Sequence, residues 1–319
     1  MWKTILRRVV IMIPQIVILS LLVFILAKFM PGDPFTGSIT PQTDASQLHA
    51  LKVQAGLYDP WYTQYVHWVV NMFHGDFGTS YQFKEPVMAV IGGRAVNTLW
   101  LSLFTVILTY LIAIPLGLLA GRYEDTNLDR GIMFFNYVTY AIPLFVFLVL
   151  GLWLFGYVLG WFPSGGSISL SANGFFGNAL SRLYHMILPG VLTALLSTTS
   201  TVQYLRSEIV DQKHQDMVAT ARAKGVPERK VFSRHILRNS LLPIAAFMGY
   251  SITGLLGGSV FVEQIFVYPG MGQLFLNSIS NRDFSVITAL VMIYGILALF
   301  GTLLSDIIMS IVDPRIRIK

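Results

Sequence analysis

Long apolar stretches alternate with shorter polar segments along the whole chain. Because a helix that crosses a bilayer needs about 20 mainly apolar residues, each stretch can be tested by its length. The stretches that are long enough are residues 9–29, 98–120, 133–158, 186–204, 241–261 and 286–311. The pattern therefore predicts an all-α integral membrane protein with six transmembrane helices and a large extracytoplasmic loop after the first.

The composition supports a membrane location. Hydrophobic residues make up 54% of the 319 residues and charged residues only 12%, whereas soluble domains carry about 25% charged residues. The net charge of +6 does not indicate a nucleic-acid partner, because the Lys and Arg residues lie between and beside the apolar stretches. The absence of cysteine excludes disulfides, thiolate metal sites and cysteine nucleophiles.

The distribution of Lys and Arg predicts the orientation of the chain. With the N-terminus inside the cell, the expected cytoplasmic segments hold 16 of the 22 basic residues. Positive charge favours the cytoplasmic side, so we expect a multi-pass protein of the cell membrane with both termini in the cytoplasm. The first stretch has too long an apolar core for a cleaved signal peptide, and we interpret it as a retained anchor.

Polarity divides the chain into three segments. They are an anchor helix over residues 1–30, an extracytoplasmic cap over 31–97 and a five-helix core over 98–319. In the cap, Asp44 can begin one helix and Pro60 with Trp61 a second, which ends before the break at Gly75 to Gly78. The cap aromatics fit equally an interfacial belt on lipid headgroups and a docking platform for an outer partner.

One polar segment, residues 206–239, separates the fourth and fifth stretches. Gly225 suits the left-handed position that closes a helix and Pro227 suits the first turn of the next, which predicts two helical arms. Each arm carries an apolar stripe that nothing else in this chain is expected to cover, so we expect it to dock in a cleft on a partner protein. Two other interpretations stay open: the basic residues only set the orientation, or the arms lie on anionic lipid. A DNA-binding helix-turn-helix receives little support, because both ends are tethered to membrane helices.

This loop resembles that of a known family. Residues 219–225, Ala-Thr-Ala-Arg-Ala-Lys-Gly, and 235–243, His-Ile-Leu-Arg-Asn-Ser-Leu-Leu-Pro, are similar to the EAA loop of membrane subunits of ATP-binding cassette (ABC) importers, in the form found in oligopeptide and dipeptide permeases. Residues 30–34, 75–80, 97–99 and 263–272 also match, so the resemblance covers nearly the whole chain. Ala219 replaces the glutamate that names the loop, and Pro243 lies farther along than in sugar importers. Both departures are features of the peptide and nickel branch.

The resemblance implies a type I ABC importer permease fold and a set of partners. We expect a second homologous permease subunit, two cytoplasmic ATP-binding subunits that hold ATP and Mg, and an extracytoplasmic substrate-binding protein. The loop would then form the coupling helices. The residues expected to couple to the ATPase are Met217, Ala219, Ala221, Arg222, Ala223, Gly225, Val226, Pro227, Val231 and Phe232. The residues expected to meet the binding protein are Gly75, Asp76, Gly78, Pro269, Gly270 and Gly272.

The chain itself is not expected to be an enzyme. No G-x-x-x-x-G-K-[ST] motif occurs, and the adjacent Lys224 and Gly225 stand in the reverse order. The sequence also contains no H-E-x-x-H motif and no nucleophile elbow in the required context. We therefore expect a non-catalytic subunit that binds no cofactor and no metal of its own.

The fourth and fifth stretches carry side chains that suit a translocation pathway. The residues expected to line it are Thr199, Gln203, Tyr250, Ser251, Thr253, Gly254 and Gly258. Helix packing explains the same residues as well, because hydroxyls can bond their own helix and glycines let helices approach. The stretches lack a charge at their midpoints, which argues against a proton-coupled secondary transporter.

An uncharged, hydroxyl-lined pathway suits a substrate that is recognised by its backbone, such as a peptide. We predict that the chain forms half of a pathway for oligopeptides or dipeptides, with the loop transmitting ATPase motion to the spans. A nickel permease is the alternative within the family. A secondary transporter or a non-transporting membrane scaffold is the alternative outside it.

Overall fold

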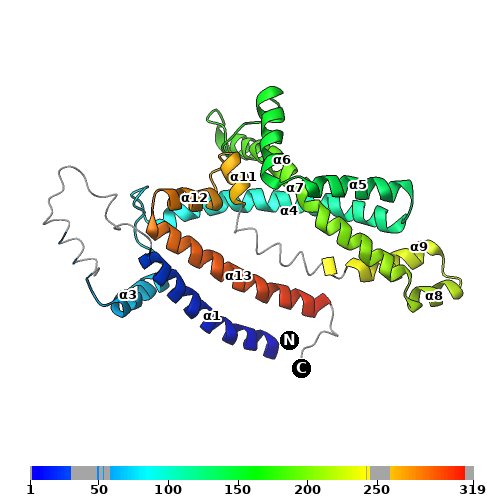
Figure 1. Ribbon diagram of the computed structural model, residues 1–319, viewed down its shortest axis with the longest axis horizontal. Helices are drawn as coiled ribbons and strands as arrows, with labels where there is room; N and C mark the ends of the chain where they lie inside the picture. The colour runs from blue at the N-terminus through cyan, green and yellow to red at the C-terminus, as the bar shows by residue number, and fades with distance from the viewer. Residues whose placement is uncertain are drawn as a thin grey trace.

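The computed structural model describes residues 2–29, 49, 53, 58–241, 243–244 and 259–312. Regular structure in these residues is helical, apart from one isolated bridge between Thr79 and Pro86 (Figure 1). The helices of the first half are α1 (Trp2–Phe29), α3 (Trp61–Phe73), α4 (Val87–Arg122), α5 (Asn127–Ala141), α6 (Leu144–Gly151) and the π-helix η2 (Leu152–Val158). Those of the second half are α7 (Gly174–Lys213), α8 (Asp216–Ala223), α9 (Glu228–Lys230), the π-helix η3 (Val231–Ile236), α11 (Val260–Ile265), α12 (Met271–Ser280) and α13 (Phe284–Val312).

Four of the described helices are long and apolar enough to cross a membrane. They are α4, α7 and the segments Leu6–Phe29 of α1 and Phe284–Leu304 of α13. The expected membrane character of the fold is therefore confirmed for these parts. Most of the expected stretch 241–261 lies outside the described residues, and so do the predicted pathway residues Tyr250, Ser251, Thr253, Gly254 and Gly258.

The expected span over residues 133–158 is a pair of helices with a bend between them rather than one helix. The chain there forms α5 and α6–η2, which are bent by 96° relative to each other. The break falls at Ile142 and Pro143, where Ile142 has an extended backbone with ψ of 122°. Proline lacks the backbone N–H and disfavours helical geometry at the residue before it, which accounts for the break at Ile142, although α4 and α7 continue through Pro115 and Pro189.

Two helices are longer than their apolar stretches predict. Helix α4 begins at Val87, eleven residues before the expected start at 98, and α7 runs over 40 residues to Lys213. At the rise of an α-helix, these lengths are about 54 Å and 60 Å. Both helices therefore extend beyond a hydrocarbon core of about 30 Å. The extension of α4 carries it into the segment expected to be cap, and that of α7 into the expected coupling loop.

Helices α4 and α7 pack in parallel along much of their length. A Cβ at Gly117 would lie 3.0 Å from Cβ of Leu205, and one at Gly121 would lie 2.7 Å from Cβ of Ile209. These distances leave no room for a side chain, so the two glycines allow the backbone of α4 to approach α7. The spacing Gly117-x-x-x-Gly121 is a signal in the sequence for such a close contact, but it does not identify the partner helix.

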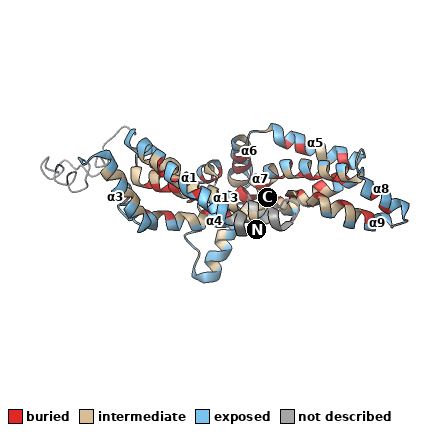
Figure 2. Cartoon of the chain, turned by 90° about the horizontal axis from the view of Figure 1, so that it is seen from below, coloured by how far each residue is buried: buried red, intermediate tan, exposed pale blue. Residues whose placement is uncertain are grey.

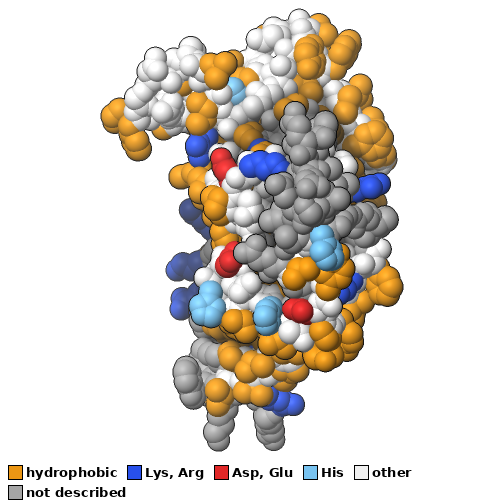
Figure 3. Space-filling view, turned by 90° about the vertical axis from the view of Figure 1, so that its left-hand side faces the viewer, with side chains coloured by type: hydrophobic (Ala, Val, Ile, Leu, Met, Phe, Trp, Pro, Cys, Tyr) orange, Lys and Arg blue, Asp and Glu red, His pale blue; other side chains and the backbone are white. Residues whose placement is uncertain are grey.

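Polar residues of α5 face inward and apolar residues face outward. Asp129, Asn136 and Thr139 are buried toward the rest of the molecule, whereas Phe134 and Tyr140 are exposed. This arrangement suits a helix whose outer side meets lipid. Figure 2 shows buried positions on the inner sides of the helices, and Figure 3 shows apolar side chains over much of another face.

Helices α1 and α13 lie side by side, as the blue and red helices of Figure 1 show. The short helix α3 packs against the C-terminal half of α1, where the hydroxyls of Tyr65 and Ser20 lie 2.8 Å apart and Tyr65 contacts the Phe24 ring edge to face. The predicted helix start at Pro60 and Trp61 is confirmed, since α3 begins at Trp61. Asp44 lies outside the described residues.

Candidate functional site

The turn between α8 and α9 has the geometry that its sequence predicts. Gly225 adopts a φ of +73°, the left-handed conformation that glycine takes most readily. Its N–H donates to the carbonyl of Arg222 at 2.9 Å, and the N–H of Val226 donates to that of Ala221 at 3.2 Å. This bonding pattern closes α8 as a Schellman motif. Pro227 lies one position earlier than expected, as the residue before α9 rather than within its first turn.

The apolar sides of the two arms are covered by the chain itself. Val218, Ala221, Val231 and Ile236 are buried in one cluster with residues of α7. Partly buried residues of α4 pack against the same cluster, namely Tyr110, Ile114 and Leu118. The expectation that a partner covers these stripes is therefore wrong, because the C-terminal half of α4 and the extension of α7 beyond residue 204 reach the arms. Ala221 and Val231, expected to couple to an ATPase, are inaccessible to a docking protein in this arrangement.

The opposite side of the arms remains open. The predicted coupling residues that are exposed there are Met217, Ala219, Arg222, Ala223, Gly225 and Pro227. Val226 and Phe232 are partly buried. Most of the exposed side chains are small, so another protein can approach the backbone of the turn closely.

Charged groups brace the turn. Arg222 donates two hydrogen bonds to Glu228, at 2.7 Å and 3.1 Å, across Gly225. The hydrogen bonds from Arg222 lower the pKa of Glu228, and the same pair raises the pKa of Arg222. The pair is exposed, so its contribution to overall stability is small. The pair connects α8 to the first residue of α9 across the turn.

The turn between α4 and α5 is tied to the same end of the molecule. The guanidinium of Arg122 lies 5.0 Å from the centre of the Phe232 ring, and Nζ of Lys213 lies 3.4 Å from Glu124. One turn farther into α5, Arg206 makes a bidentate pair with the buried Asp129 at 2.6 Å and 2.7 Å. The arms, α4, α5 and α7 therefore meet in one connected unit.

At the other end of the molecule, the loop before α4 is fastened to the start of α13. Asp283 is buried and accepts hydrogen bonds from the hydroxyl of Ser80 and from the N–H of Gln82 at 3.1 Å. Asp76, one of the expected docking residues, accepts from the N–H of Gly78 at 2.8 Å and stays exposed, as do Gly75 and Gly78. The tip of this loop is thus accessible on a fixed base.

The second expected docking segment is organised around a buried carboxylate. Glu263 of α11 accepts hydrogen bonds from the hydroxyl of Thr98 at 2.7 Å and from the N–H of Gln273 at 3.0 Å. Gly270 and Gly272 are buried against it, so neither can touch a docking protein in this arrangement, while Pro269 is partly exposed. Burial of the carboxylate raises the pKa of Glu263, and the hydrogen bonds oppose that shift.

Sequence reasoning overlooked both buried acids. For Asp283, the available signal was an acidic residue directly before a long apolar helix, the usual position of a helix cap. For Glu263, the signal was a carboxylate at the end of an apolar stretch, followed by two glycines within ten residues. Neither signal identifies the hydroxyl partners Ser80 and Thr98, which lie more than 150 positions away in the sequence.

The predicted pathway residues of α7 divide between two faces. Thr199 is buried, with no hydrogen-bond partner for its hydroxyl in the described structure, and Gln203 is partly exposed. Thr199 therefore does not line an open surface here, which corrects that expectation. The hydroxyl residues that are exposed at helical spacing are Ser197, Ser200, Tyr204 and Ser207. They form one stripe along α7, which makes them the better candidates for a polar lining.

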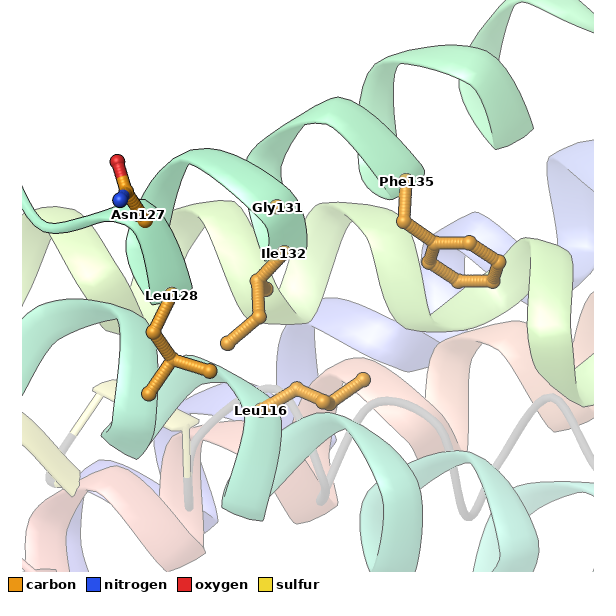
Figure 4. Close-up of a pocket in the computed structure, with 6 residues that line it drawn as sticks. All are labelled: Leu116, Asn127, Leu128, Gly131, Ile132 and Phe135. Atoms are coloured by element: carbon orange, nitrogen blue, oxygen red, sulfur yellow. The ribbon is translucent and has the colours of Figure 1, made fainter.

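A cavity of about 290 Å³ lies between α4 and α5. It is lined by Leu116, Asn127, Leu128, Gly131, Ile132 and Phe135 (Figure 4). Leu116, Leu128 and Ile132 converge in it, whereas the amide of Asn127 is turned away. Such an apolar hollow offers no hydrogen bonds to a polar substrate. Among the described residues, no group of three or more His, Asp or Glu side chains could hold a metal ion.

Comparisons with known proteins agree with this architecture. The family described as binding-protein-dependent transport system inner membrane component matches residues 113–318, and its N-terminal counterpart matches residues 1–102. The chain is 40% identical to the oligopeptide transport system permease protein AppB of Bacillus subtilis, over 98% of both chains. It is 35% identical to a putative peptide transport system permease protein of Brucella abortus, over 99% of both. It is 32% identical to the glutathione transport system permease protein GsiC of Salmonella choleraesuis, over the full length of both.

Solved structures share the fold. The MetNI methionine ABC transporter, in an inward-facing conformation, contains a chain that superposes with a TM-score of 0.56 at 16% identity. The match covers 72% of this chain and 99% of that one. A chain of an amino acid ABC transporter superposes with a TM-score of 0.53 at 17% identity, over 70% and 94% of the two chains. The present chain belongs to the family of binding-protein-dependent transport system inner membrane components.

Proposed function

We propose that this chain is the non-catalytic transmembrane subunit of an ATP-driven importer and forms half of a pathway for peptides. Relatives of full length that are named as oligopeptide, peptide and glutathione permeases support a peptide substrate. The same names do not favour the nickel alternative. ATP and Mg would be bound by partner subunits, since the chain has no phosphate-binding loop.

The proposal rests mainly on one observation. The arms pack against the C-terminal ends of α4 and α7 with one side, and their other side is exposed. A cytoplasmic ATPase that grips Ala219, Ala223 and Gly225 would push on a unit whose other side is buried against the two long helices. Motion of the ATPase would then reach the spans through apolar packing. Two ATPases would be needed, one for this chain and one for a second permease subunit.

The proposed topology has six spans and two cytoplasmic termini. Helices α4 and α7 run parallel to each other, and α5 packs beside both and runs in the opposite direction. With the arms in the cytoplasm, α4 and α7 would run inward and α11, α12 and the Gly75 loop would lie outside. Residues 241–261 would supply the remaining span. An extracytoplasmic binding protein would then deliver the peptide to the outer surface.

The proposed pathway runs along the polar stripe of α7. Ser197, Ser200, Tyr204 and Ser207 offer hydroxyl groups, and Gln203 lies beside them. Tyr250, Ser251, Thr253, Gly254 and Gly258 would line the pathway from the neighbouring span. Hydroxyl and amide groups can bond a peptide backbone without preferring one side chain, which leaves selection to the binding protein.

Replacement of Gly225 tests the coupling role. Among the described residues, no atom lies within 4 Å of a Cβ built at Gly225, so Gly225→Trp meets no clash at its Cβ but strains the left-handed turn and adds bulk to the exposed side. In proteoliposomes that contain both permease subunits and both ATPases, supplied with the binding protein, we expect labelled-peptide uptake to fall about tenfold, as a loss of 1.4 kcal/mol in coupling would cause. ATP hydrolysis should continue without uptake.

The matched control is Gly225→Asn, because asparagine accepts the left-handed conformation. This variant should transport peptides at nearly the wild-type rate. Normal ATP-driven uptake by Gly225→Trp would contradict the coupling role. If the wild-type complex takes up nickel but not peptides, the proposal that peptides are the substrate is contradicted.

A further inference from the structure

The carboxylate of Glu263 occupies a space that is shaped by the two glycines after it. Glu263 is fully buried, with 0% of its surface exposed. A Cβ at Gly270 would lie 2.3 Å from Cδ of Glu263 and within 2.5 Å of both carboxylate oxygens. A Cβ at Gly272 would lie 3.1 Å from Oε2. The glycines therefore let the chain between α11 and α12 close around the carboxylate.

This carboxylate joins the α11–α12 turn to α4. The Thr98 hydroxyl that donates to Glu263 also accepts from the N–H of Met271 at 2.8 Å. One residue earlier on α4, the amide of Asn97 donates to the carbonyl of Pro269 at 2.9 Å. A further turn back, Arg94 donates to the side chain of Gln273 at 3.1 Å. Three residues within two turns of α4 thus hold the segment between α11 and the start of α12, and the Glu263 carboxyl group lies among them.

The turn needs such support because its backbone is strained. Val267 has a φ of +46°, a conformation that β-branched residues rarely adopt. Its side chain is 61% exposed, so packing of that side chain does not stabilise the conformation. Strained residues of this kind persist only where the surrounding contacts fix them. The contacts of Glu263, Thr98 and Asn97 supply that constraint.

Helix α4 continues from this turn to the coupling arms. Its inner half contributes Ile114 and Leu118 to the packing of the arm cluster. Near the inner end, Gly121 brings α4 against Ile209 of α7 too closely for the helices to slide freely. One helix therefore contacts the outer turn at one end and the arms at the other.

We propose that Glu263 is a positioning residue for transport, whose carboxylate fixes the turn over residues 266–270 to α4 and so connects the outer surface with the coupling arms. The proposal rests on the proposed function, because it assigns the connection a role in the response of the ATPases to the binding protein. Without the carboxylate, the turn relaxes and the outer signal no longer reaches α4.

A double-mutant cycle tests this role in the full complex with both ATPases, the second permease subunit and the binding protein. The variants are Glu263→Ala, Gly270→Ala and the double variant. We expect each single variant to retain basal ATP hydrolysis but to lose stimulation by the binding protein about tenfold, the effect of losing charged hydrogen bonds. The double variant should be stimulated by the binding protein at least as strongly as Glu263→Ala, because the methyl group added at position 270 enters the space that the carboxylate has vacated. Losses that add independently would overturn the proposal.

Two further variants separate positioning from folding. Glu263→Gln keeps the volume and the bond from Thr98 but places an NH₂ group beside the N–H of Gln273, so an intermediate stimulation is expected. Gln264→Ala, at an exposed position of the same helix, should behave as wild type. If the wild-type complex is not stimulated by the binding protein, the proposed function fails. If the wild-type complex is stimulated, and the complexes with Glu263→Ala and with Glu263→Gln are stimulated as strongly as the wild type, only the positioning role fails.

Discussion

At the scale of single residues, the turn at Gly225 depends on one backbone conformation and one ion pair. The left-handed glycine closes α8, and the hydrogen bonds between Arg222 and Glu228 span the turn. The two features have different effects. The glycine allows the left-handed backbone conformation, and the ion pair connects α8 to α9. A change in either should alter the exposed side of the arms without disturbing their buried side.

Acidification should loosen this turn. The pKa of Glu228 is lowered by Arg222, so the pair favours the folded turn above the ordinary glutamate value of 4.5. That contribution is lost as the pH falls through the lowered value in the folded protein. Amide hydrogen exchange at Gly225 and Val226, corrected for the intrinsic effect of pH, should therefore accelerate in that range.

The control for this prediction is Glu228→Gln. It lacks the titrating group, so its corrected exchange should be faster than wild type at neutral pH and nearly independent of pH. Equal exchange in the two proteins at neutral pH would show that the pair does not fix the turn.

At the scale of helices, the close pairing of α4 and α7 decides how the arms are supported. The pairing explains why the apolar stripes of the arms are buried within the chain rather than left for a partner. It also explains why glycines, rather than larger apolar residues, occupy positions 117 and 121. Both observations follow from the distance between the two backbones.

Adding a single methyl group at this contact should separate the helices. In Gly121→Ala, the new Cβ would lie 2.7 Å from Cβ of Ile209, so the helices must shift. Overpacking of this kind costs about 1–3 kcal/mol. We expect a lower midpoint of thermal unfolding in detergent, together with reduced ATP-driven uptake by the complex.

Gly93→Ala provides the matched control on the same helix. No atom of the described part of the chain lies within 4 Å of a Cβ built there, so the alanine should be neutral or should stabilise α4 by about 1 kcal/mol. An unfolding midpoint for Gly121→Ala equal to that of Gly93→Ala would show that the α4–α7 contact adapts without cost.

At the scale of the whole molecule, the two candidate surfaces lie at opposite ends of α4. The arms gather at the end with Arg122, and the segments with Glu263 and Asp283 gather at the end with Val87. The helix is about 54 Å long, which is enough to separate the two sides of a membrane. A membrane across its middle would place one surface on each side.

Cysteine labelling tests this arrangement without background, because the chain contains no cysteine. Lys224→Cys marks the arms and Gln264→Cys marks α11, both at exposed positions. In intact cells, a membrane-impermeant maleimide should label Gln264→Cys, and Lys224→Cys should react only after permeabilisation. Labelling of both from the same side would contradict a span within residues 241–261.

The sequence by itself determined the membrane class, most of the long helices, the left-handed turn at Gly225 and the family resemblance. These features depend on local composition, on apolar length and on the conformational preference of single residues, all of which are visible in a short window. The bend at Pro143 also had a local signal, but the apolar run on both sides concealed it.

Only the tertiary structure decided which side of the arms is open, that Gly270 and Gly272 are buried, and that Thr199 is enclosed while Ser197 and Ser200 are exposed. It also brought Glu263 to Thr98 and Asp283 to Ser80. These outcomes depend on the distances between helices that are far apart in the sequence. The physical reason is that burial is set by the neighbours a residue acquires on folding, and a hydrophobic pattern records only that a side needs covering, not which segment covers it.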